Sequence, residues 1–587
     1  MKTLVVLALA LCVVAAQHCI GQQHAWPPSA PGPAPIMTGI TLGGGKVLPS
    51  TRRWNLVWAD QIVPSWVTPG QVAFAARNFV GTQKIFRSQI PDFEAVNPNW
   101  LVLSYHLATC LNPAANSDCP DPKLNSGTDF IGVVAPKGYV SEYTEYFRPW
   151  LAAKGIAENS PVFEAMFQHY DAAAPGKRVW LGDPAWLMNL EDANWRTYVT
   201  ETSLDWLRGN ANQGMFFDVA VETNAYLFNP NASNPAPTDF DWWLSPHKPF
   251  GFPGDITSRN EFSPYMNQQF LRYFQHVYRQ FHAGDTTYLV IPNVDQMITT
   301  VYDPVWLDGD ANGETVDGAM IESFGHATGG DMYLTLERTI RHITGRGKIL
   351  IAQSYPSTPA ENLRLIGMFM LVKNAQSYVN FLSNSGVEWY PEYEIDLGTQ
   401  SAVPATLDAL RVAGSGGNGL WMRTYEKGAV LCNTSGAPIP YTLSGSGWSR
   451  VVCNGGGDVA ADGSTLQQSL GAVAISGVQV VLPSDCVILQ HAAATGIDAA
   501  SAQQPSGLAL YPQPADDFVT LQTNGEGDGI RSIRVYNSIG AEMTVSRREY
   551  TTNGKLLRLD VRGYAPGIYT ILVESSGTLQ RALLLHH

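Results

Sequence analysis

The sequence predicts a (β/α)8 barrel followed by two small β-sandwich domains, and three observations lead to that fold class. Strand-like apolar runs alternate with amphipathic helical patterns over the first 400 residues, and beyond residue 401 short alternating strands with Gly, Ser and Asn turns replace them. The eight apolar runs occupy residues 54–59, 84–87, 100–105, 215–219, 288–291, 318–321, 349–352 and 377–381. The helical patterns between the later runs cover residues 260–282, 332–344 and 359–373. An open doubly wound sheet is the competing fold, but no GxGxxG motif follows the first run.

The apolar content and the charge distribution of the chain exclude some classes of function. A chain of 587 residues with 45% hydrophobic and only 15% charged residues has enough apolar side chains to fold into two to four domains. The net charge of −14 comes without any run of basic residues, and phosphate backbones require such a run. We therefore expect no nucleic acid partner.

The N-terminus has the pattern of a secretory signal peptide over residues 1–16. Lys2 supplies the positive charge, residues 4–14 the apolar stretch, and the small residues before Gln17 the cleavage site. Residues 17–50 read as a Pro/Gly-rich leader. No later stretch is long and apolar enough for a membrane helix, so we expect no transmembrane segment in the mature chain.

Composition also suggests the domain boundaries. We assign the catalytic barrel to residues 51–400 and a β-sandwich to residues 401–491. A linker of small and polar residues spans 492–507, and residues 508–587 return to strands as a second β-sandwich.

Cysteines are expected to form disulfides in an oxidising compartment. Cys110 and Cys119 bracket one loop and are the first predicted pair, and Cys432 with Cys453 is the second. Because no CxxC motif or close His pair is present, we expect no metal site and no cofactor.

Polar residues follow the apolar runs, and in a barrel the carboxyl ends of the strands carry the active site. They are Asp60, Gln89, His106, Asp218, Asn293, Glu322 and Gln353. Of these we assign Asp60, His106, Asn293 and Gln353 to substrate binding. The alternative for each residue is a solvated strand end with no function.

Asp218 and Glu322 are the candidate catalytic pair. Asp218 follows two Phe residues and Glu322 follows an apolar run, so each carboxylate must be hydrogen-bonded, protonated or functional. Two carboxylates at one barrel mouth are the groups that hydrolyse a glycosidic bond, one as an acid and the other as a nucleophile or base. Glu222 is the reserve candidate and is otherwise assigned to substrate binding. The alternative is that both are acids satisfied by neighbours at the edge of the core.

Two loops carry weaker patterns. Residues 226–253 form a long aromatic segment in which Trp242 and Trp243 are candidate sugar-binding residues, although packing against the barrel explains them equally well. Residues 308–319 resemble the first half of a calcium loop, but Ala319 stands where a bidentate Glu is needed, which favours a plain acidic turn.

The tail resembles the C-terminal sorting domain of the type IX secretion system. The pieces LALYPQPADDFVTLQ, IRSIRVYNSIGAEM and LRLDVRGYAPGIYTILVESSG follow that family's motifs in order, with Gln513 in place of the usual Asn. The final His586 and His587 replace its usual Lys-rich end. The resemblance implies the type IX secretion machinery as a partner and a secreted or outer-membrane surface location in a Gram-negative cell. An adhesive immunoglobulin-like module is the alternative.

Residues 51–490 resemble glycoside-hydrolase-like barrels, above all glycosyl-hydrolase-like family fifteen. The matching pieces are WLGDPAWLMNLEDANWRTYVTETSLDWLRGNANQGMFFD, VDGAMIESFGH, KILIAQSYPS, WYPEYEIDLG and LWMRTYEKGAVLCNTS. The resemblance implies Asp218 as the carboxylate of the fourth barrel strand and Glu322 as its partner on a later strand.

The sequence therefore predicts a secreted or cell-surface glycoside hydrolase that cleaves a polysaccharide or oligosaccharide with two carboxylates. The alternative is a non-catalytic carbohydrate-binding or structural surface protein on the same barrel. No GxSxG, HExxH or P-loop motif supports acyl transfer, zinc proteolysis or nucleotide hydrolysis.

Overall fold

The computed structural model of the chain describes most of the residues between 42 and 491 and the strands of the tail. The described residues are 42–62, 67–85, 87–111, 142–158, 160–167, 186–210, 212–218, 220, 259–284, 287–294, 303–326, 330–382, 387–443, 446–491, 508–511, 518–523, 530–537, 542–543, 545, 548–550, 556–564, 567–575 and 578–586. The predicted signal peptide and the linker 492–507 lie outside them. No helix in the described part of the chain is long and apolar enough to cross a membrane.

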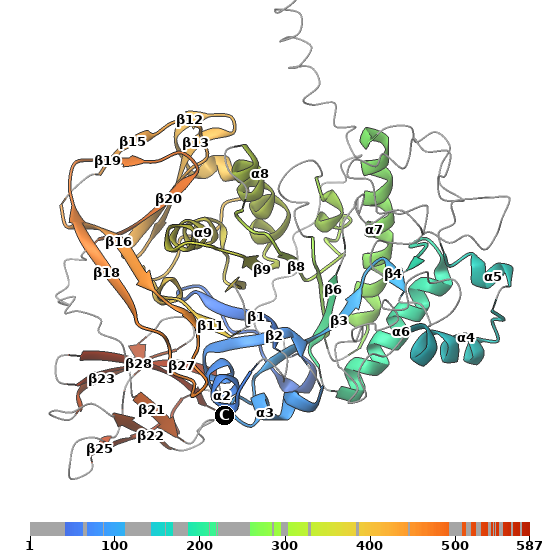
Figure 1. The fold of residues 1–587 in the computed structure, drawn as a ribbon, viewed down its shortest axis with the longest axis horizontal. Coiled ribbons are helices and arrows are strands. Elements are labelled where there is room, and N and C mark those ends of the chain that lie inside the picture. Colours follow the sequence, from blue (N-terminus) through green and yellow to red (C-terminus); the bar gives the residue numbers. More distant parts are fainter. Residues whose placement is uncertain are drawn as a thin grey trace, which may run out of the picture.

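Eight parallel strands form the predicted barrel (Figure 1). They are β1 (Leu56–Ile62), β2 (Phe79–Ile85), β3 (Leu101–Leu107), β6 (Gly214–Asp218), β7 (Leu289–Pro292), β8 (Gly318–Ile321), β9 (Ile349–Ser354) and β10 (Ser377–Phe381). Their order is β7-β6-β3-β2-β1-β10-β9-β8. A parallel bridge between Asn293 and Met320 joins the two ends of this sheet, and the amide of Val294 donates to the carbonyl of Met320 at 2.9 Å. The barrel fold is thereby confirmed.

Alternation along the strands separates two apolar clusters. One face of the strands forms a cluster that includes Trp58, Leu103, Phe216 and Ile351. The residues one position along belong to the large cluster that the strands share with the helices. This period of two identifies the first cluster as the barrel interior. The polar residue that ends a strand therefore enters the mouth only if it lies on the interior side of the pleat.

Helices cover the outside of the barrel. They are α2 (Pro69–Asn78), α3 (Ile90–Glu94), α6 (Ala193–Asn210), α7 (Arg259–Phe281), α8 (Gly330–Arg338) and α9 (Pro359–Val372). Between β3 and α6 the chain forms an excursion with β4 (Cys110–Leu111), α4 (Arg148–Lys154), α5 (Pro161–Glu164) and β5 (Trp186–Leu187), which lies to one side in Figure 1. The prediction of the second strand at 84–87 is displaced, because β2 begins at Phe79 and buries the polar Thr82 and Gln83 in its middle.

The second part of the fold is a β-sandwich packed beside α9 (Figure 1). Its six-stranded sheet contains β12 (Arg411–Ser415), β13 (Asn418–Tyr425), β14 (Gly428–Asn433), β20 (Asp485–His491), β16 (Trp448–Gly455) and β18 (Gln468–Ile475). A two-stranded sheet of β15 (Ile439–Thr442) and β19 (Val478–Val481) covers one face, and an apolar cluster that includes Leu431 and Val481 fills the space between the two sheets.

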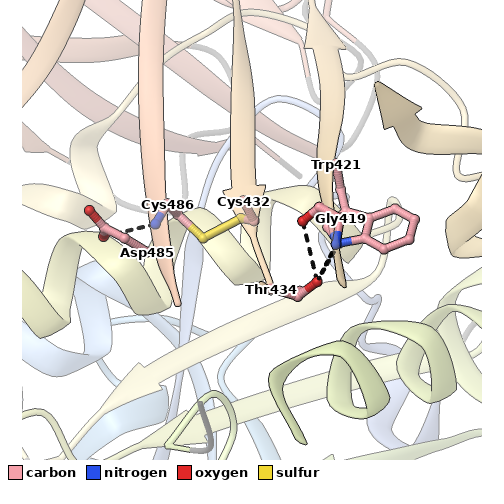
Figure 2. Close-up of a disulfide and its surroundings, with 6 residues drawn as sticks. All are labelled: Gly419, Trp421, Cys432, Thr434, Asp485 and Cys486. Atoms are coloured by element: carbon pink, nitrogen blue, oxygen red, sulfur yellow. Dashed lines mark hydrogen bonds between the residues drawn. A yellow bond between two sulfur atoms is a disulfide. The ribbon is translucent and has the colours of Figure 1, made fainter. Parts of the chain in front are cut away.

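The disulfide prediction needs a correction. Cys432 pairs with Cys486, not with Cys453 (Figure 2). Cys432 and Cys486 are directly opposite residues on the neighbouring strands β14 and β20, whereas Cys453 lies on β16 and has a free thiol. Strand register rather than spacing along the chain decides the partner. Cys119 of the other predicted pair lies outside the described residues.

The tail forms two four-stranded sheets that enclose their own apolar cluster. One sheet contains β21 (Leu508–Tyr511), β22 (Phe518–Thr523), β26 (Leu556–Asp560) and β25 (Arg548–Tyr550). The other contains β24 (Glu542–Met543), β23 (Ile530–Asn537), β27 (Gly567–Ser575) and β28 (Thr578–His586). The second sandwich is therefore present, while the individual domain boundaries stay predictions.

Candidate active site at the barrel mouth

Asp218 and Glu322 share one hydrogen-bond donor. Asp218 ends β6, Asn293 follows β7, and Glu322 follows β8, so three neighbouring strands deliver them to the same edge. The amide nitrogen Nδ2 of Asn293 donates to Oδ1 of Asp218 at 2.8 Å and to Oε2 of Glu322 at 2.6 Å. The structure thus brings the two predicted carboxylates together.

Each of the two carboxylates also accepts a hydrogen bond from a tyrosine hydroxyl. The hydroxyl of Tyr105 on β3 donates to Oδ2 of Asp218 at 2.6 Å. The hydroxyl of Tyr355, just beyond β9, donates to Oε1 of Glu322 at 2.7 Å and accepts from Nε2 of Gln353 at 2.7 Å. Because the side-chain amide of Gln353 donates a hydrogen bond to the Tyr355 oxygen, the hydroxyl hydrogen of Tyr355 points to Glu322.

Asp60 anchors the opposite side of the mouth. Its Oδ1 atom accepts from Nε2 of Gln83 at 2.9 Å and lies 3.0 Å from Nζ of Lys84, both on β2. Its Oδ2 atom lies 3.4 Å from Nε2 of Gln353. The side-chain amide of Asn380 on β10 donates to the side-chain carbonyl of Gln353 at 3.4 Å, so polar side chains of the neighbouring strands β1, β10 and β9 line this part of the mouth.

The surroundings of the mouth raise the pKa of Glu322 and of Tyr355. Burial raises the pKa of Glu322, and the nearby Asp218 raises that pKa further, although the hydrogen bonds from Tyr355 and Asn293 and the charge of Lys84 oppose the shift. Burial next to Glu322 also raises the pKa of the Tyr355 hydroxyl, which keeps it a donor at neutral pH. A buried acid with a raised pKa is the form of carboxyl group that can deliver a proton near neutrality.

His106 does not join this cluster. Its ring lies on the outer side of β3, 2% exposed, with Nε2 at 2.9 Å from Oε1 of Glu142. Glu142 also accepts from the hydroxyl of Tyr198 at 2.9 Å. The preceding residue, Tyr105, faces the mouth instead, because successive side chains of a strand point to opposite faces. The assignment of His106 to substrate binding has no support in this arrangement.

Other predicted residues lie elsewhere. Gln89 is buried in a short 3-10 helix beyond the end of β2. Glu222, Trp242 and Trp243 lie outside the described residues. Asn293, just after β7, and Gln353, the next-to-last residue of β9, both reach the mouth, and their role in substrate binding stays a prediction.

Sequence reasoning missed Lys84, Tyr105 and Tyr355. Counting by twos from the interior residue Leu103 would have selected Tyr105. Lys84 is the first residue of the predicted run 84–87, whereas in the structure it lies one residue before the end of β2. Tyr355 stands two residues after Gln353 and carries no pattern of its own.

The acidic turn at 308–319 has cationic partners. Asp308 lies 2.8 Å from Nε of Arg346, and Asp310 lies 3.0 Å from a guanidinium nitrogen of Arg279. Across the described ranges, no group of three or more His, Cys, Asp or Glu side chains could hold a metal ion.

A depression of about 300 Å³ lies on α6 and α7, away from the barrel mouth. It is lined by Arg196, Arg272, His276 and Arg279, and none of the mouth residues lines it.

Two family models match separate parts of this chain. Residues 266–429 match the model of hypothetical glycosyl hydrolase family 15. This glycosyl hydrolase match includes Asn293, Glu322, Gln353 and Tyr355, and it begins after Asp218. Residues 509–584 match the secretion system C-terminal sorting domain. No curated protein matches the chain.

Solved structures similar to this chain include carbohydrate-active enzymes. A noncanonic maltogenic alpha-amylase, AmyB, from Thermotoga neapolitana is 10% identical, with 75% of this chain and 99% of that chain covered and a TM-score of 0.34. The alpha-glucosyl transfer enzyme XgtA is 8% identical, with 75% and 99% covered and a TM-score of 0.38. A cycloisomaltooligosaccharide glucanotransferase from Paenibacillus sp. is 8% identical, with 87% and 83% covered and a TM-score of 0.30.

Proposed function

We propose that this protein is a glycoside hydrolase that acts on a polysaccharide or oligosaccharide with retention of anomeric configuration. The observation that carries the proposal is the single Asn293 amide nitrogen that bonds both Asp218 and Glu322. Oδ1 of Asp218 and Oε2 of Glu322 lie 2.8 and 2.6 Å from this one nitrogen, so the distance between the two oxygens cannot exceed the sum of these values. That distance is shorter than the about 6.5–9.5 Å that separates the carboxyl groups of an inverting enzyme, which must leave room for a water molecule.

The roles of the two carboxylates follow from their surroundings. Glu322, with its pKa raised by burial and by Asp218, would protonate the leaving-group oxygen. Asp218, whose two oxygens accept from Tyr105 and Asn293, would attack the anomeric carbon and form a glycosyl-enzyme intermediate. Glu322 would then remove a proton from the water that hydrolyses this intermediate.

The sorting-domain match supports export to the cell surface or medium. Together with the apolar N-terminal segment, it favours a route across the inner membrane by a signal peptide and across the outer membrane by the type IX machinery. A polymeric or oligomeric glycan is the substrate class that such an exported enzyme would meet.

A glycan-library screen with reducing-end detection tests the activity, with Asp218→Asn and Glu322→Gln as variants. Asp218→Asn keeps the size of the side chain, so we expect its thermal transition to change little while turnover falls at least ~10³-fold, about 4 kcal/mol of transition-state stabilisation. Glu322→Gln should lose less on substrates with good leaving groups, because such groups need no proton.

Proton NMR of the first product decides the stereochemistry. We expect the anomer of the substrate to appear first and to mutarotate later. Appearance of the opposite anomer would contradict the retaining mechanism. If the wild-type chain binds a glycan without cleaving it, the non-catalytic carbohydrate-binding alternative replaces the enzyme, and full activity of Glu322→Gln would make Glu222 the next acid to test.

A further inference from the structure

The turn after β8 holds Tyr355 by its side chain and by its backbone. This β8 turn covers residues 322–326, with Glu322 at its start and His326 at its end. The hydroxyl of Tyr355 donates to Oε1 of Glu322 at 2.7 Å, and the backbone amide of Tyr355 donates to Nε2 of His326 at 2.8 Å. The ring centroids of His326 and Tyr355 lie 6.0 Å apart.

The β8 turn is itself fixed against β9 and α9. The amide of Phe324 donates to the carbonyl of Gln353 at 2.9 Å, and the hydroxyl of Ser354 donates to the Phe324 carbonyl at 2.5 Å. Gly325 has a φ of +75°, which glycine adopts without strain, and a Cβ atom there would lie 2.5 Å from Cδ2 of Leu365 on α9. A turn with contacts on both sides therefore presents the His326 ring to Tyr355.

The Tyr355 amide determines the protonation state that His326 must have. A backbone N–H can only donate, so Nε2 of His326 accepts with its lone pair, and the proton of the neutral ring then lies on Nδ1. The protonated ring carries hydrogen on both nitrogens and offers no acceptor. The hydrogen bond therefore exists only while His326 is neutral.

The surroundings of the ring favour the neutral form. Partial burial lowers the pKa of His326, and Arg364 on α9 lowers it further, although Glu361 on the same helix opposes the shift. Among the described residues, the other titratable side chain in contact with the ring is Tyr355. His326 is exposed to solvent, so the ring can take up a proton without unfolding of the chain.

We propose that His326 is a positioning residue that keeps Tyr355 in place against Glu322, and that it does so only while its ring is neutral. The effect on turnover rests on the proposed function, in which Glu322 protonates the leaving-group oxygen. Acidification through the midpoint of His326 releases the Tyr355 amide and loosens the hydroxyl that orients Glu322. The hydrogen bonds themselves need no substrate.

Nitrogen-15 NMR of the full chain labelled on His tests the state of the ring, and His326→Gln identifies its resonances. We expect Nε2 to be unprotonated and Nδ1 protonated at pH 7.5, with a midpoint below the ordinary value of about 6.5. A proton on Nε2 at pH 7.5, or a midpoint above that ordinary value, overturns the inference.

His326→Gln and His326→Asn form a matched pair of variants. The side-chain oxygen of Gln lies as many bonds from Cα as Nε2 of His and accepts at every pH, whereas the Asn oxygen is one bond closer to the backbone. The bond from Tyr355 lowers the pKa of Glu322, so His326→Asn should raise the Glu322 midpoint, as Tyr355→Phe should, and His326→Gln should not. Carbon-13 NMR of the full chain labelled on Glu measures this midpoint, with Glu322→Gln to identify the resonance.

The control is His491→Gln at the end of β20 in the sandwich, which should leave the Glu322 midpoint at its wild-type value. An unchanged midpoint in folded His326→Asn overturns the inference. If that variant does not fold, His326→Ala takes its place in the same titration.

In an active enzyme, pH dependence separates this role from a structural one. The ratio of kcat/KM of His326→Gln to that of the wild type should rise about threefold from pH 7.5 to pH 5, because only the wild type loses its acceptor on acidification. A ratio independent of pH overturns the inference. A wild-type chain that cleaves no glycan refutes the proposed function alone, and the two NMR titrations still decide the role of His326.

Discussion

At the scale of single residues, the mouth is built by the pleat of the strands. Asp60, Tyr105, Asp218 and Gln353 each follow an interior apolar residue by two positions: Trp58, Leu103, Phe216 and Ile351. Side chains that alternate between two faces return to the same face after two residues. These four polar side chains therefore form the last layer of the barrel interior, directly above the apolar side chains that fill it.

Tyr355→Phe tests the hydrogen bond to Glu322. Removal of the hydroxyl takes away a donor that stabilises the ionised form of Glu322, so we expect the pKa of Glu322 to rise and the basic limb of the kcat/KM profile to move to higher pH. Turnover should fall about tenfold because the acid loses an orienting partner. Tyr441→Phe in the sandwich, whose hydroxyl contacts Met422, is the control and should leave the profile unchanged.

At the scale of elements, the connection between β7 and β8 depends on ionic contacts. It contains the 3-10 helix η7 (Val305–Asp308). His342 contacts this connection from the π-helix η8 (Thr339–Ile343), which directly follows α8. The His342 ring, 1% exposed, lies between Oδ1 of Asp303 and Oδ1 of Asp308, each at 2.7 Å. Arg338 and Arg341 lie next to Asp303, Arg346 next to Asp308, and Glu337 beside Arg341; the buried Lys348 also interacts with Asp308.

His342→Gln should make stability depend less on pH. The two aspartates raise the pKa of His342 although its burial opposes this, so its contribution is complete below the unfolded-state pKa of about 6.5 and disappears as pH rises through the higher folded-state pKa. The pKa of Asp303 is lowered, so its contribution disappears only in strong acid. We expect the wild-type chain to exceed the variant by about 2 kcal/mol near pH 5.5 and by less at pH 9, measured by urea unfolding.

The control for this prediction is His276→Gln. Burial and the nearby Arg196 lower the pKa of His276, the opposite direction from His342, so His276→Gln should not produce a stability gap that is larger at pH 5.5 than at pH 9. A stability gap for His342→Gln that stays constant from pH 5.5 to pH 9 would contradict the charged state of His342.

Helix α9 ends against a buried arginine of the sandwich. The Arg423 guanidinium on β13 donates to the carbonyls of Met370 and Leu371 in the last turn of the helix and of Lys373, the residue that follows it. On the same helix, a Cβ atom at Gly367 would lie 2.6 Å from the Cβ atom of Cys486, so glycine permits the contact with the disulfide strand. Helix and sandwich are therefore joined by a cap and by close packing.

Arg423→Met should destabilise this junction strongly. It removes the Arg423 donor from the buried carbonyls of Leu371 and Lys373, which we expect to cost about 3–5 kcal/mol of unfolding free energy. Tyr425→Phe removes one bond to the Met370 carbonyl and should cost about 1 kcal/mol. Differential scanning calorimetry compares the two, and an equal decrease in Tm would refute the capping role.

At the scale of the whole molecule, the tail has its own core. The apolar cluster of the tail sandwich contains no residue from the barrel or the first sandwich. A cation–π contact joins them, with the Arg53 guanidinium 5.2 Å from the ring centroid of Tyr536. Such a contact is worth about 1 kcal/mol, which is small beside the stability of a domain.

A chain that ends at His491 should therefore keep the thermal transition of the barrel and sandwich within about 2 °C and lose export. Calorimetry of the shortened chain checks the first part, and fractionation of expressing cells checks the second. Arg53→Gln in the full chain controls for the cation–π contact. Aggregation of the shortened chain would show that the predicted boundary is wrong.

The sequence by itself determined the fold class and the two central carboxylates. Alternation of strands and helices, and the end of an apolar run, are local patterns that the backbone must obey wherever the segment lies. Asp218 and Glu322 could be found because each ends such a run.

Only the tertiary structure decided which side chains meet. Lys84 reaches Asp60, Tyr355 reaches Glu322, and Cys432 reaches Cys486. Each pair lies on or just beyond neighbouring strands whose register no local pattern specifies. His106 and Tyr105 are adjacent in the chain, yet the pleat places one behind the barrel wall and the other in the mouth. Spatial neighbours depend on strand order and register, and these depend on the packing of the whole chain.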